Sequence, residues 1–501
     1  MAWNQIKLVR ETKENQSPFS AEPRPFFFLT ITALIWFYLF VWALNLKVLV
    51  DWANLWGPVT LGLVTGWSGF LLIRSKPITV WSPYAWALLT IVLFYSIGPL
   101  VYTLGNPQVV GYVNSFLPIS SLDLLHTNLL DAVGIFSLLC GFYLTRNWGW
   151  KNQNLQPMKR VQPNLRAVAL VFLVTGGALE YVLVLPDELG IIHTVVPGVI
   201  LNIGELYLMG LLIWGFLIAR GSHELLFRFV LLWLIQIVLT FLTFNKGVFF
   251  FSLLLPFLGI YMGCPKLGYL LLFSVFAIGI YFVTARFSYW ARIELAKQKE
   301  VSGLVKNLFV RSKITIDYFV ESNHFSGVQE NTSNAAISWG RLNYANVQSF
   351  AMSRYDSGLP GHTLKDTGII LIPRFFWPEK PKITNQGTDF YYLVSGRHGT
   401  SLGLGIFGEG YWDYGWWGVL GLSFVTGMFF ALLGNLSLGW IARSEFEYLP
   451  SVFTGISVGF GALPGLFVTS VIGASGFFLL YALLVWLVLN LVPRFRLTGA
   501  R

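Results

Sequence analysis

The repeated long apolar runs of this chain constrain its fold more than any other feature. A helix needs roughly 20 apolar residues to cross the hydrocarbon core of a bilayer, and runs of that kind recur along most of the 501 residues. Hydrophobic residues make up 55% of the chain and charged residues only 12%, whereas soluble domains carry about 25% charged residues. The sequence therefore predicts an all-α polytopic membrane protein.

Hydropathy predicts the positions of about twelve spans. They cover residues 25–46, 52–73, 81–102, 124–145, 167–186, 196–219, 225–244, 247–264, 267–285, 416–440, 449–470 and 474–492. Proline or glycine residues interrupt 247–264 and 449–470, and irregular backbone at membrane depth is tolerated only where protein or a cavity surrounds it. A broken or re-entrant helix is therefore the alternative to a full crossing at these two places.

Lysine and arginine residues orient the predicted spans, because basic residues in short loops stay on the cytoplasmic side. With the N-terminus inside, eighteen of the 34 basic residues fall in cytoplasmic segments, and only Lys47 and Lys246 fall in short external loops. The other fourteen lie in one long segment between the ninth and tenth spans. The prediction is a multi-pass protein with both termini in the cytoplasm.

This topology divides the chain into five parts. They are a cytoplasmic N-terminal tail (1–24), a nine-helix transmembrane region (25–285), an extracytoplasmic loop or cap (286–415), a three-helix transmembrane region (416–492) and a cytoplasmic C-terminal tail (493–501). The cap holds 25 of the 58 charged residues, and apolar residues recur at helical spacing over 289–320 and 335–355. We therefore expect a large helical loop that contains the candidate active site.

Three carboxylates lie inside predicted spans, where an ionisable group is costly unless it faces a partner or a polar cavity. They are Asp131, Glu180 and Glu205, each in the outer half of its helix. One interpretation is a shared cavity that opens to the outside, and a proton relay of this kind would indicate a transporter. The other is that each acid forms a separate hydrogen bond between helices. The sequence leaves both open.

No residue pattern indicates a metal site or a cofactor. Cys140, in an apolar run, and Cys264, beside Pro265, are too few for a disulfide framework or a thiolate site. The net charge of +10 sorts by membrane side, so we expect no nucleic-acid partner. Lys246 either anchors a helix at the headgroups or contacts a lipid phosphate, with Arg286 close by.

The stretch 361–418 is the most distinctive part of the sequence. Three prolines between residues 373 and 381 fix φ and remove amide donors, so this part is rigid and non-helical. Rigid backbone that displays Arg374, Lys380 and Lys382 suits an anion, because arginine offers phosphate a bidentate fork and lysine adds a point charge. The alternative is a proline-rich strap whose cations are only solvated.

Two motifs in this stretch resemble those of a known family. The first is Ile372-Pro373-Arg374-Phe375-Phe376-Trp377-Pro378-Glu379-Lys380-Pro381-Lys382, and the second is Gly408-Glu409-Gly410-Tyr411-Trp412-Asp413-Tyr414-Gly415, at the start of span 416–440. Together they resemble the O-antigen polymerase (Wzy-type oligosaccharide repeat-unit polymerase) family. The resemblance covers roughly residues 340–420 at motif level and the whole chain in its hydropathy plan.

The resemblance implies a GT-C-like, metal-independent glycosyltransferase of the bacterial inner membrane. Such a polymerase transfers the growing glycan from undecaprenyl diphosphate to the next lipid-linked repeat unit, in the synthesis of O-antigen lipopolysaccharide, exopolysaccharide or capsule. The implied partners are the lipid-linked donor and acceptor, the bilayer and a regulator of chain length. Arg374, Lys380 and Glu409 fall in the matched motifs, and Arg341 stands where an upstream loop arginine is expected.

Elementary chemistry gives these residues roles. Cations in a low-dielectric groove stabilise a departing diphosphate, so Arg374 is the catalytic cation, while Arg341, Lys380, Lys382, Lys246 and Arg286 are expected to bind substrate. Glu409 is the expected base for the acceptor hydroxyl, and Asp413 is expected to bind the acceptor beside it.

Two rival functions stay open at this point. A glycan ligase would move finished polymer to another acceptor and would rest on an external histidine, of which the cap offers His324, His362 and His398. A lipid-linked oligosaccharide flippase or other transporter would fit the number of spans and the intramembrane acids. It would not explain a charged cap.

Overall fold

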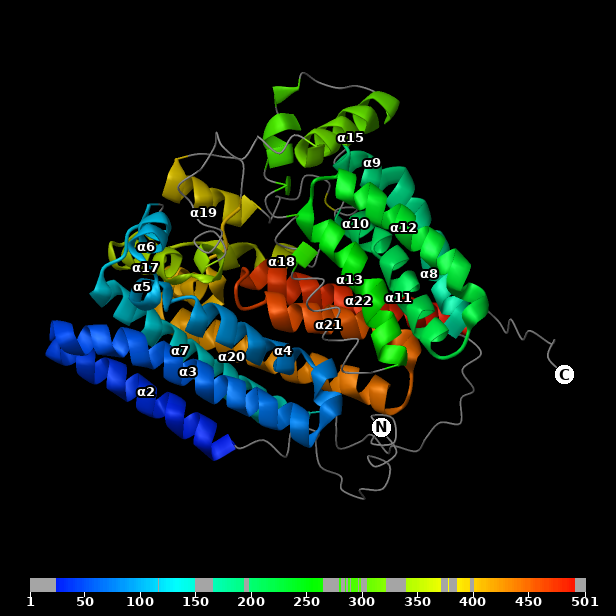
Figure 1. The fold of residues 1–501 in the computed structure, drawn as a ribbon. Helices are drawn as coiled ribbons and strands as arrows, with labels where there is room; N and C mark the ends of the chain where they lie inside the picture. Colours follow the sequence, from blue (N-terminus) through cyan, green and yellow to red (C-terminus); the bar gives the residue numbers. More distant parts are fainter. Residues whose placement is uncertain are drawn as a thin grey trace. The chain divides into compact units, whose positions relative to one another are not determined.

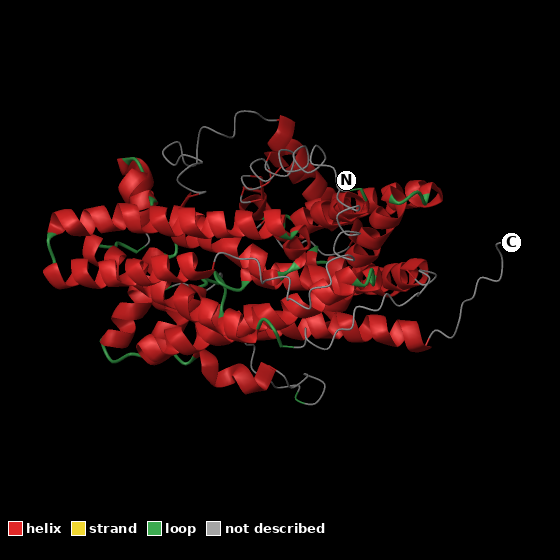
Figure 2. Cartoon of the chain, turned by 90° about the horizontal axis from the view of Figure 1, so that it is seen from below, coloured by secondary structure: helices red, strands yellow, loops and turns green. Residues whose placement is uncertain are grey.

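The computed structural model describes residues 24–115, 117–148, 165–192, 198–264, 279–280, 284, 287–288, 290–295, 297–298, 304–320, 339–370, 377, 385–396 and 401–491. Regular secondary structure within these ranges is helical, without strands, as the sequence predicts (Figure 2). The chain divides into two compact units. Unit 1 comprises residues 159–330 with both chain ends (1–9 and 482–501), and unit 2 comprises 10–158 and 331–481.

Unit 2 contains most of the long helices (Figure 1). They are α2 (Arg24–Leu44), α3 (Lys47–Ser75), η2 (Pro77–Trp81), α4 (Pro83–Thr90), η3 (Ile91–Ile97), α5 (Val101–Leu104), α6 (Pro107–Asn114), α7 (Ser121–Thr145), α17 (Ala345–Asp356), η7 (Thr363–Asp366), α18 (Thr367–Ile370), α19 (Asn385–Ser395), α20 (Gly405–Ala442), η8 (Phe446–Tyr448), α21 (Leu449–Gly461) and η9 (Phe467–Gly473). Helix α22 (Ala474–Leu491) begins in unit 2.

Helices α7 and α20 form the centre of unit 2 and run in the same direction. The Ser137 hydroxyl donates to the carbonyl of Leu420 at 2.7 Å, and farther along both helices the Asn435 amide donates to the carbonyl of Arg146 at 2.8 Å. A Cβ at Gly427 would collide with the backbone of α7. Close backbone approach at small residues is typical of helix packing in membranes. The shared direction is the one that the predicted topology gives these two spans.

Unit 1 is built around α11. Its helices are α8 (Leu165–Leu179), η4 (Glu180–Val184), α9 (Leu185–Glu188), α10 (Gly198–Gly204), α11 (Leu206–Ala219), η5 (His223–Leu225), α12 (Leu226–Leu242), α13 (Lys246–Gly263) and α15 (Leu304–Val320). Helix α11 is buried along most of its length. Gly210 lies against α8, and Gly215 lies against the backbone of Pro256 in α13. Glycines therefore let three apolar helices approach at backbone distance.

Eight helices in the described ranges are long and apolar enough to cross a membrane, and each overlaps a predicted span, although Gly405–Ala442 begins within the predicted cap. This confirms a polytopic membrane protein. The predicted spans 196–219 and 247–264 correspond to shorter apolar helices, Leu206–Ala219 and Gly247–Gly263, and 267–285 lies largely outside the described residues. The total of twelve spans and the GT-C-like fold stay predictions.

The predicted span 449–470 is broken. Helix α21 has 13 residues, or about 20 Å at 1.5 Å per residue, which is less than the thickness of the hydrocarbon core. The α-helix ends at Gly461, Leu466 is extended, and the chain becomes helical again at Phe467. The Tyr95 hydroxyl and the Ile406 amide both donate to the carbonyl of Leu463, at 2.6 and 3.0 Å. Neighbouring helices thus satisfy the backbone that the break frees.

Residues 339–370, part of the predicted cap, belong to unit 2 and pack against its segment between η3 and α7. The Trp339 indole donates to the carbonyl of Ile97 at 2.8 Å, and the Asn343 amide donates to the Tyr102 hydroxyl at 2.9 Å. Asn346 donates to the carbonyl of Val113 at 3.0 Å. This part of the cap therefore lies beside the loop that joins η3 to α7.

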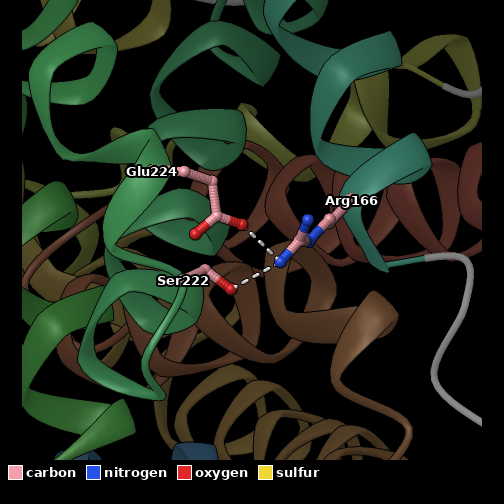
Figure 3. Close-up of polar contacts among 3 residues, drawn as sticks. All are labelled: Arg166, Ser222 and Glu224. Carbon is pink, nitrogen blue, oxygen red and sulfur yellow. Dashed lines mark hydrogen bonds and ion pairs between the residues drawn. The ribbon is translucent and has the colours of Figure 1, made fainter. Parts of the chain in front are cut away.

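An exposed polar contact joins two loops of unit 1 (Figure 3). At the start of α8, Arg166 donates to the Ser222 hydroxyl at 2.9 Å and pairs with Glu224 at 2.7 Å. The predicted topology places both loops on the cytoplasmic side. Because more than half of each charged side chain is exposed, this pair contributes little stability.

Candidate functional site

The second sequence motif forms a sharp turn within α20. Tyr414 and Gly415 leave helical geometry, and Gly415 adopts φ 60° and ψ −146°, a conformation close to one that is available almost only to glycine. The turn brings Gly410 and Gly418 together, so a Cβ on Gly418 would collide with the carbonyl oxygen of Gly410. Gly410 and Gly415 of the motif are therefore explained by the geometry of the turn.

Glu409 lies on the buried side of this turn. Its side chain has no exposed surface, and one carboxylate oxygen accepts a hydrogen bond from the backbone amide of Phe467 at 2.5 Å. The other oxygen, Oε1, has no hydrogen-bond partner among the described residues. Glu409 thus links the motif to the break between α21 and η9. Its predicted role as a base stays a prediction.

Asp413 links the 3₁₀ helix η7 to the same turn through hydrogen bonds. Its carboxylate accepts hydrogen bonds from the Thr363 amide at 3.3 Å, the Thr363 hydroxyl at 2.9 Å and the Leu364 amide at 2.9 Å. A Cβ on Gly361 would collide with this carboxylate and with the Trp412 ring. The side chain predicted to bind the acceptor therefore caps a helix start, where backbone amides need an acceptor.

Tyr411 connects the motif to α17. Its hydroxyl donates to the Asp356 carboxylate at 3.0 Å, and its ring meets that of Tyr355 edge to face, with centroids 5.4 Å apart. Helix α17 is also tied to α7, because the buried Gln348 donates to Asp131 at 2.8 Å. Both contacts orient α17 at the end of α7.

An open pocket of about 270 Å³ lies between α7 and α17. Its walls carry two carboxylates, an imidazole, three hydroxyls and a thioether, from Asp123, His126, Ser349, Met352, Ser353, Asp356 and Ser357. Among the described residues, no lysine or arginine lines it. A pocket of this composition suits a hydroxyl-rich neutral group, such as a sugar, better than a diphosphate.

His126 gives the pocket its chemistry. It lies on the second turn of α7, half-buried, with its ring edge to face against Trp42 at a centroid distance of 5.5 Å. Asp123 stands one turn earlier, where it forms a capping box with Ser120. An imidazole that shares a pocket with carboxylates can accept a proton, because the carboxylates stabilise the imidazolium that forms. His126 is therefore a candidate general base.

The sequence patterns did not point to His126. An external histidine was expected only in the cap, whereas His126 lies inside the predicted span 124–145. The available signal was the spacing Ser120-x-x-Asp123-x-x-His126, because a helix N-cap followed by residues at i and i+3 puts the carboxylate and the imidazole on one face.

Several predicted site residues fall outside the described part of the chain. These are Arg286, Arg374, Lys380 and Lys382, and among the cap histidines His324 and His398. Arg341 is exposed just before α17, and Lys246 is the first residue of α13. Glu409 and Asp413 lie on one turn in unit 2, while Lys246 belongs to unit 1. An anion site built from these cations stays a prediction.

The intramembrane acids divide between the units. Asp131 belongs to unit 2 and accepts from Gln348, whereas Glu180 belongs to unit 1 and accepts from the Gln236 amide at 2.9 Å. Glu205 is exposed, just before α11. Asp131 and Glu180 therefore each have a hydrogen-bond partner on a neighbouring helix, as the interpretation of separate interhelical hydrogen bonds expects. The shared cavity stays a prediction.

Comparison with models of protein families, with curated proteins and with solved structures finds no match to this chain.

Proposed function

We propose that this protein is a membrane glycosyltransferase that polymerises lipid-linked oligosaccharide repeat units. In this proposal it works in the bacterial inner membrane, without a metal, and transfers the growing glycan from undecaprenyl diphosphate to the next lipid-linked repeat. The function would serve O-antigen, exopolysaccharide or capsule synthesis. The observation that carries the proposal is the pocket between α7 and α17, where His126 faces the same space as Asp123 and Asp356.

The pocket fits the acceptor half of this reaction. His126 would take the proton of an acceptor hydroxyl as its oxygen bonds to the anomeric carbon of the donor, and the bond from that carbon to the diphosphate would break. Asp123, Asp356 and the serine hydroxyls would hold the other sugar hydroxyls. The motif supports this arrangement through Tyr411, which holds Asp356 at the pocket.

The diphosphate half requires cations, and none of the described residues that line the pocket is a lysine or an arginine. Arg374, Lys380 and Lys382 of the proline-rich segment are the proposed group, because a guanidinium can grip two phosphate oxygens as negative charge develops there. In the proposal the segment 372–382 brings this charge to the donor, while α7 and α17 hold the acceptor.

The test uses the purified full-length protein in nanodiscs with lipid-linked repeat units, read as a glycan ladder on a gel. The wild type should give a ladder, and His126→Gln should lower turnover by a factor of about 10²–10⁴, the usual contribution of a general base. The matched control is His223→Gln, since His223 is exposed and belongs to unit 1, whereas the described residues that line the pocket belong to unit 2. Unchanged substrate with wild-type protein would reject the polymerase.

A transporter of lipid-linked oligosaccharides is the second candidate, and the break between α21 and η9 favours it. Interrupted helices in transporters line substrate sites, and buried Glu409 stands at this one. The same nanodisc assay separates the candidates, because a flippase forms no new glycosidic bond. Movement of the substrate across liposomes without a ladder would favour transport.

A further inference from the structure

Helix α15 of unit 1 is held in place by a buried arginine. Arg311 donates to the Asn307 side chain at 2.7 Å, to the Leu242 carbonyl at 2.9 Å and to the Leu189 carbonyl at 3.0 Å. Its guanidinium also lies over the Phe244 ring, 5.3 Å from the centroid. One planar group, with its donors in a fixed fork, thus ties α15 to two other segments.

Both segments that Arg311 holds are the ends of candidate spans. Leu242 is the last residue of the span His223–Leu242, and Leu189 directly follows the span Leu165–Glu188. The end of a span lies at the level of the lipid headgroups. Helix α15 therefore sits where the bilayer meets water, across the ends of α9 and α12 (Figure 1).

The outer surface of α15 is apolar. Phe309, Ile316 and Val320 are 69%, 59% and 73% exposed, and their spacing of seven and four residues places them in one stripe along the helix. The opposite face is packed, since Ile314 belongs to a core cluster with Phe244. A soluble surface rarely presents such a stripe, whereas a helix lying in a membrane interface does.

Charged residues border this stripe along one edge. Lys306 and Lys313 are exposed, seven residues apart, while the one acidic residue of the helix, Asp317, is half-buried beside them. Lysine stems can lie along apolar surface with the ammonium group at phosphate level. This edge therefore complements the anionic phosphates of a lipid surface.

We propose that α15 is an interfacial helix that lays Phe309, Ile316 and Val320 into the headgroup region of the bilayer, with Lys306 and Lys313 on lipid phosphates. Arg311 holds the helix against the ends of two spans through hydrogen bonds, so α15 stays at the membrane interface in this proposal. The inference does not depend on the proposed enzymatic function.

The test attaches an environment-sensitive fluorophore to Ile316→Cys in the full-length chain, with Cys140 and Cys264 replaced by alanine. The protein is placed in nanodiscs of phosphatidylcholine with phosphatidylglycerol, some of it spin-labelled at the headgroup as a quencher. Lys365→Cys, an exposed position on η7, is the control. Quenching at 316 should exceed that at 365 by about twofold or more, because interfacial helices sink ~5–10 Å into the boundary region.

A second measurement tests the lysines. In Lys306→Glu with Lys313→Glu, quenching by labelled phosphatidylglycerol should fall toward that by labelled phosphatidylcholine, since each basic residue contributes about fivefold to anionic-lipid attraction. Equal quenching at 316 and 365 in the wild-type background would overturn the proposal. So would oxidation of the unlabelled Ile316→Cys protein to a disulfide-linked dimer, which would assign the stripe to a second copy of the chain.

Discussion

The backbone amide of Phe467 donates a hydrogen bond to the carboxylate of Glu409, and this contact spans 58 positions of sequence. Phe467 is the first residue of the helical segment after the break, so its amide has no acceptor within its own helix. The motif residue Glu409 supplies that acceptor. The motif and the broken span are therefore parts of one structural arrangement.

Substitutions at Glu409 should distinguish two roles of its carboxylate, which are to accept the hydrogen bond of the Phe467 amide and to act as a general base. Glu409→Ala would leave the Phe467 amide buried without a partner, at a cost of about 1–3 kcal/mol. Glu409→Gln keeps an acceptor oxygen, so the stability lost should be small. We expect thermal inactivation, followed by size-exclusion after heating, to be accelerated for Ala much more than for Gln. If Gln is well folded yet gives no glycan ladder, Glu409 is the base instead.

Alanine at Gly415 should disrupt the turn in α20. The backbone conformation would be strained, and the new Cβ would lie 2.9 Å from the Tyr355 ring, so we expect a loss of about 1–3 kcal/mol. Gly421→Ala on the same helix is the control, because nothing lies within 4 Å of its Cβ, and alanine should add roughly 0.5–1 kcal/mol there. Equal thermal stability of the two variants would contradict the turn.

Removing the carboxylate of Asp413 should release η7. Asp413→Ala deprives two backbone amides and the Thr363 hydroxyl of their acceptor, and losing such a cap costs about 0.5–2 kcal/mol. Limited proteolysis near residue 364 should accelerate as the segment opens. The exposed Asp389→Ala is the matched control, and it should be cleaved at the wild-type rate. An Asp413→Ala variant with unchanged cleavage would show that other contacts hold η7.

Arg311 should be far more important for stability than the exposed Arg166. Burial lowers the pKa of Arg311 to about 10, so it stays charged at neutral pH. Arg311→Met would leave the buried Leu189 carbonyl and the partly buried Leu242 carbonyl without this donor, at about 1–3 kcal/mol for the buried one. Arg166→Ala removes an exposed pair, at less than about 1 kcal/mol. The measurement is the fraction that stays monodisperse after heating in detergent. A smaller loss for Arg311→Met than for Arg166→Ala would refute the anchoring role.

Local patterns accounted for the eight long apolar helices and for the shared direction of α7 and α20. The eight long apolar helices could be predicted because a run of about 20 apolar residues has few alternatives to crossing a bilayer. The interruption in 449–470 could also be anticipated from its Gly and Pro residues. The residues that satisfy the backbone at this break could not be predicted, because Tyr95 and Glu409 are distant in sequence from Leu463 and Phe467.

The candidate site could be predicted only in part from local sequence patterns. The motif 408–415 was identified by its residues, yet a carboxylate in sequence does not show whether it meets a substrate or a backbone amide. The pocket was missed because its walls come from α7 and α17, more than 200 residues apart. The sequence by itself determined a helical membrane protein, since hydropathy is a property of single segments. Only the tertiary structure decided that His126 shares a pocket with Asp356 and that Glu409 accepts a hydrogen bond from the Phe467 amide after the break. Both depend on contacts between segments that are distant in sequence.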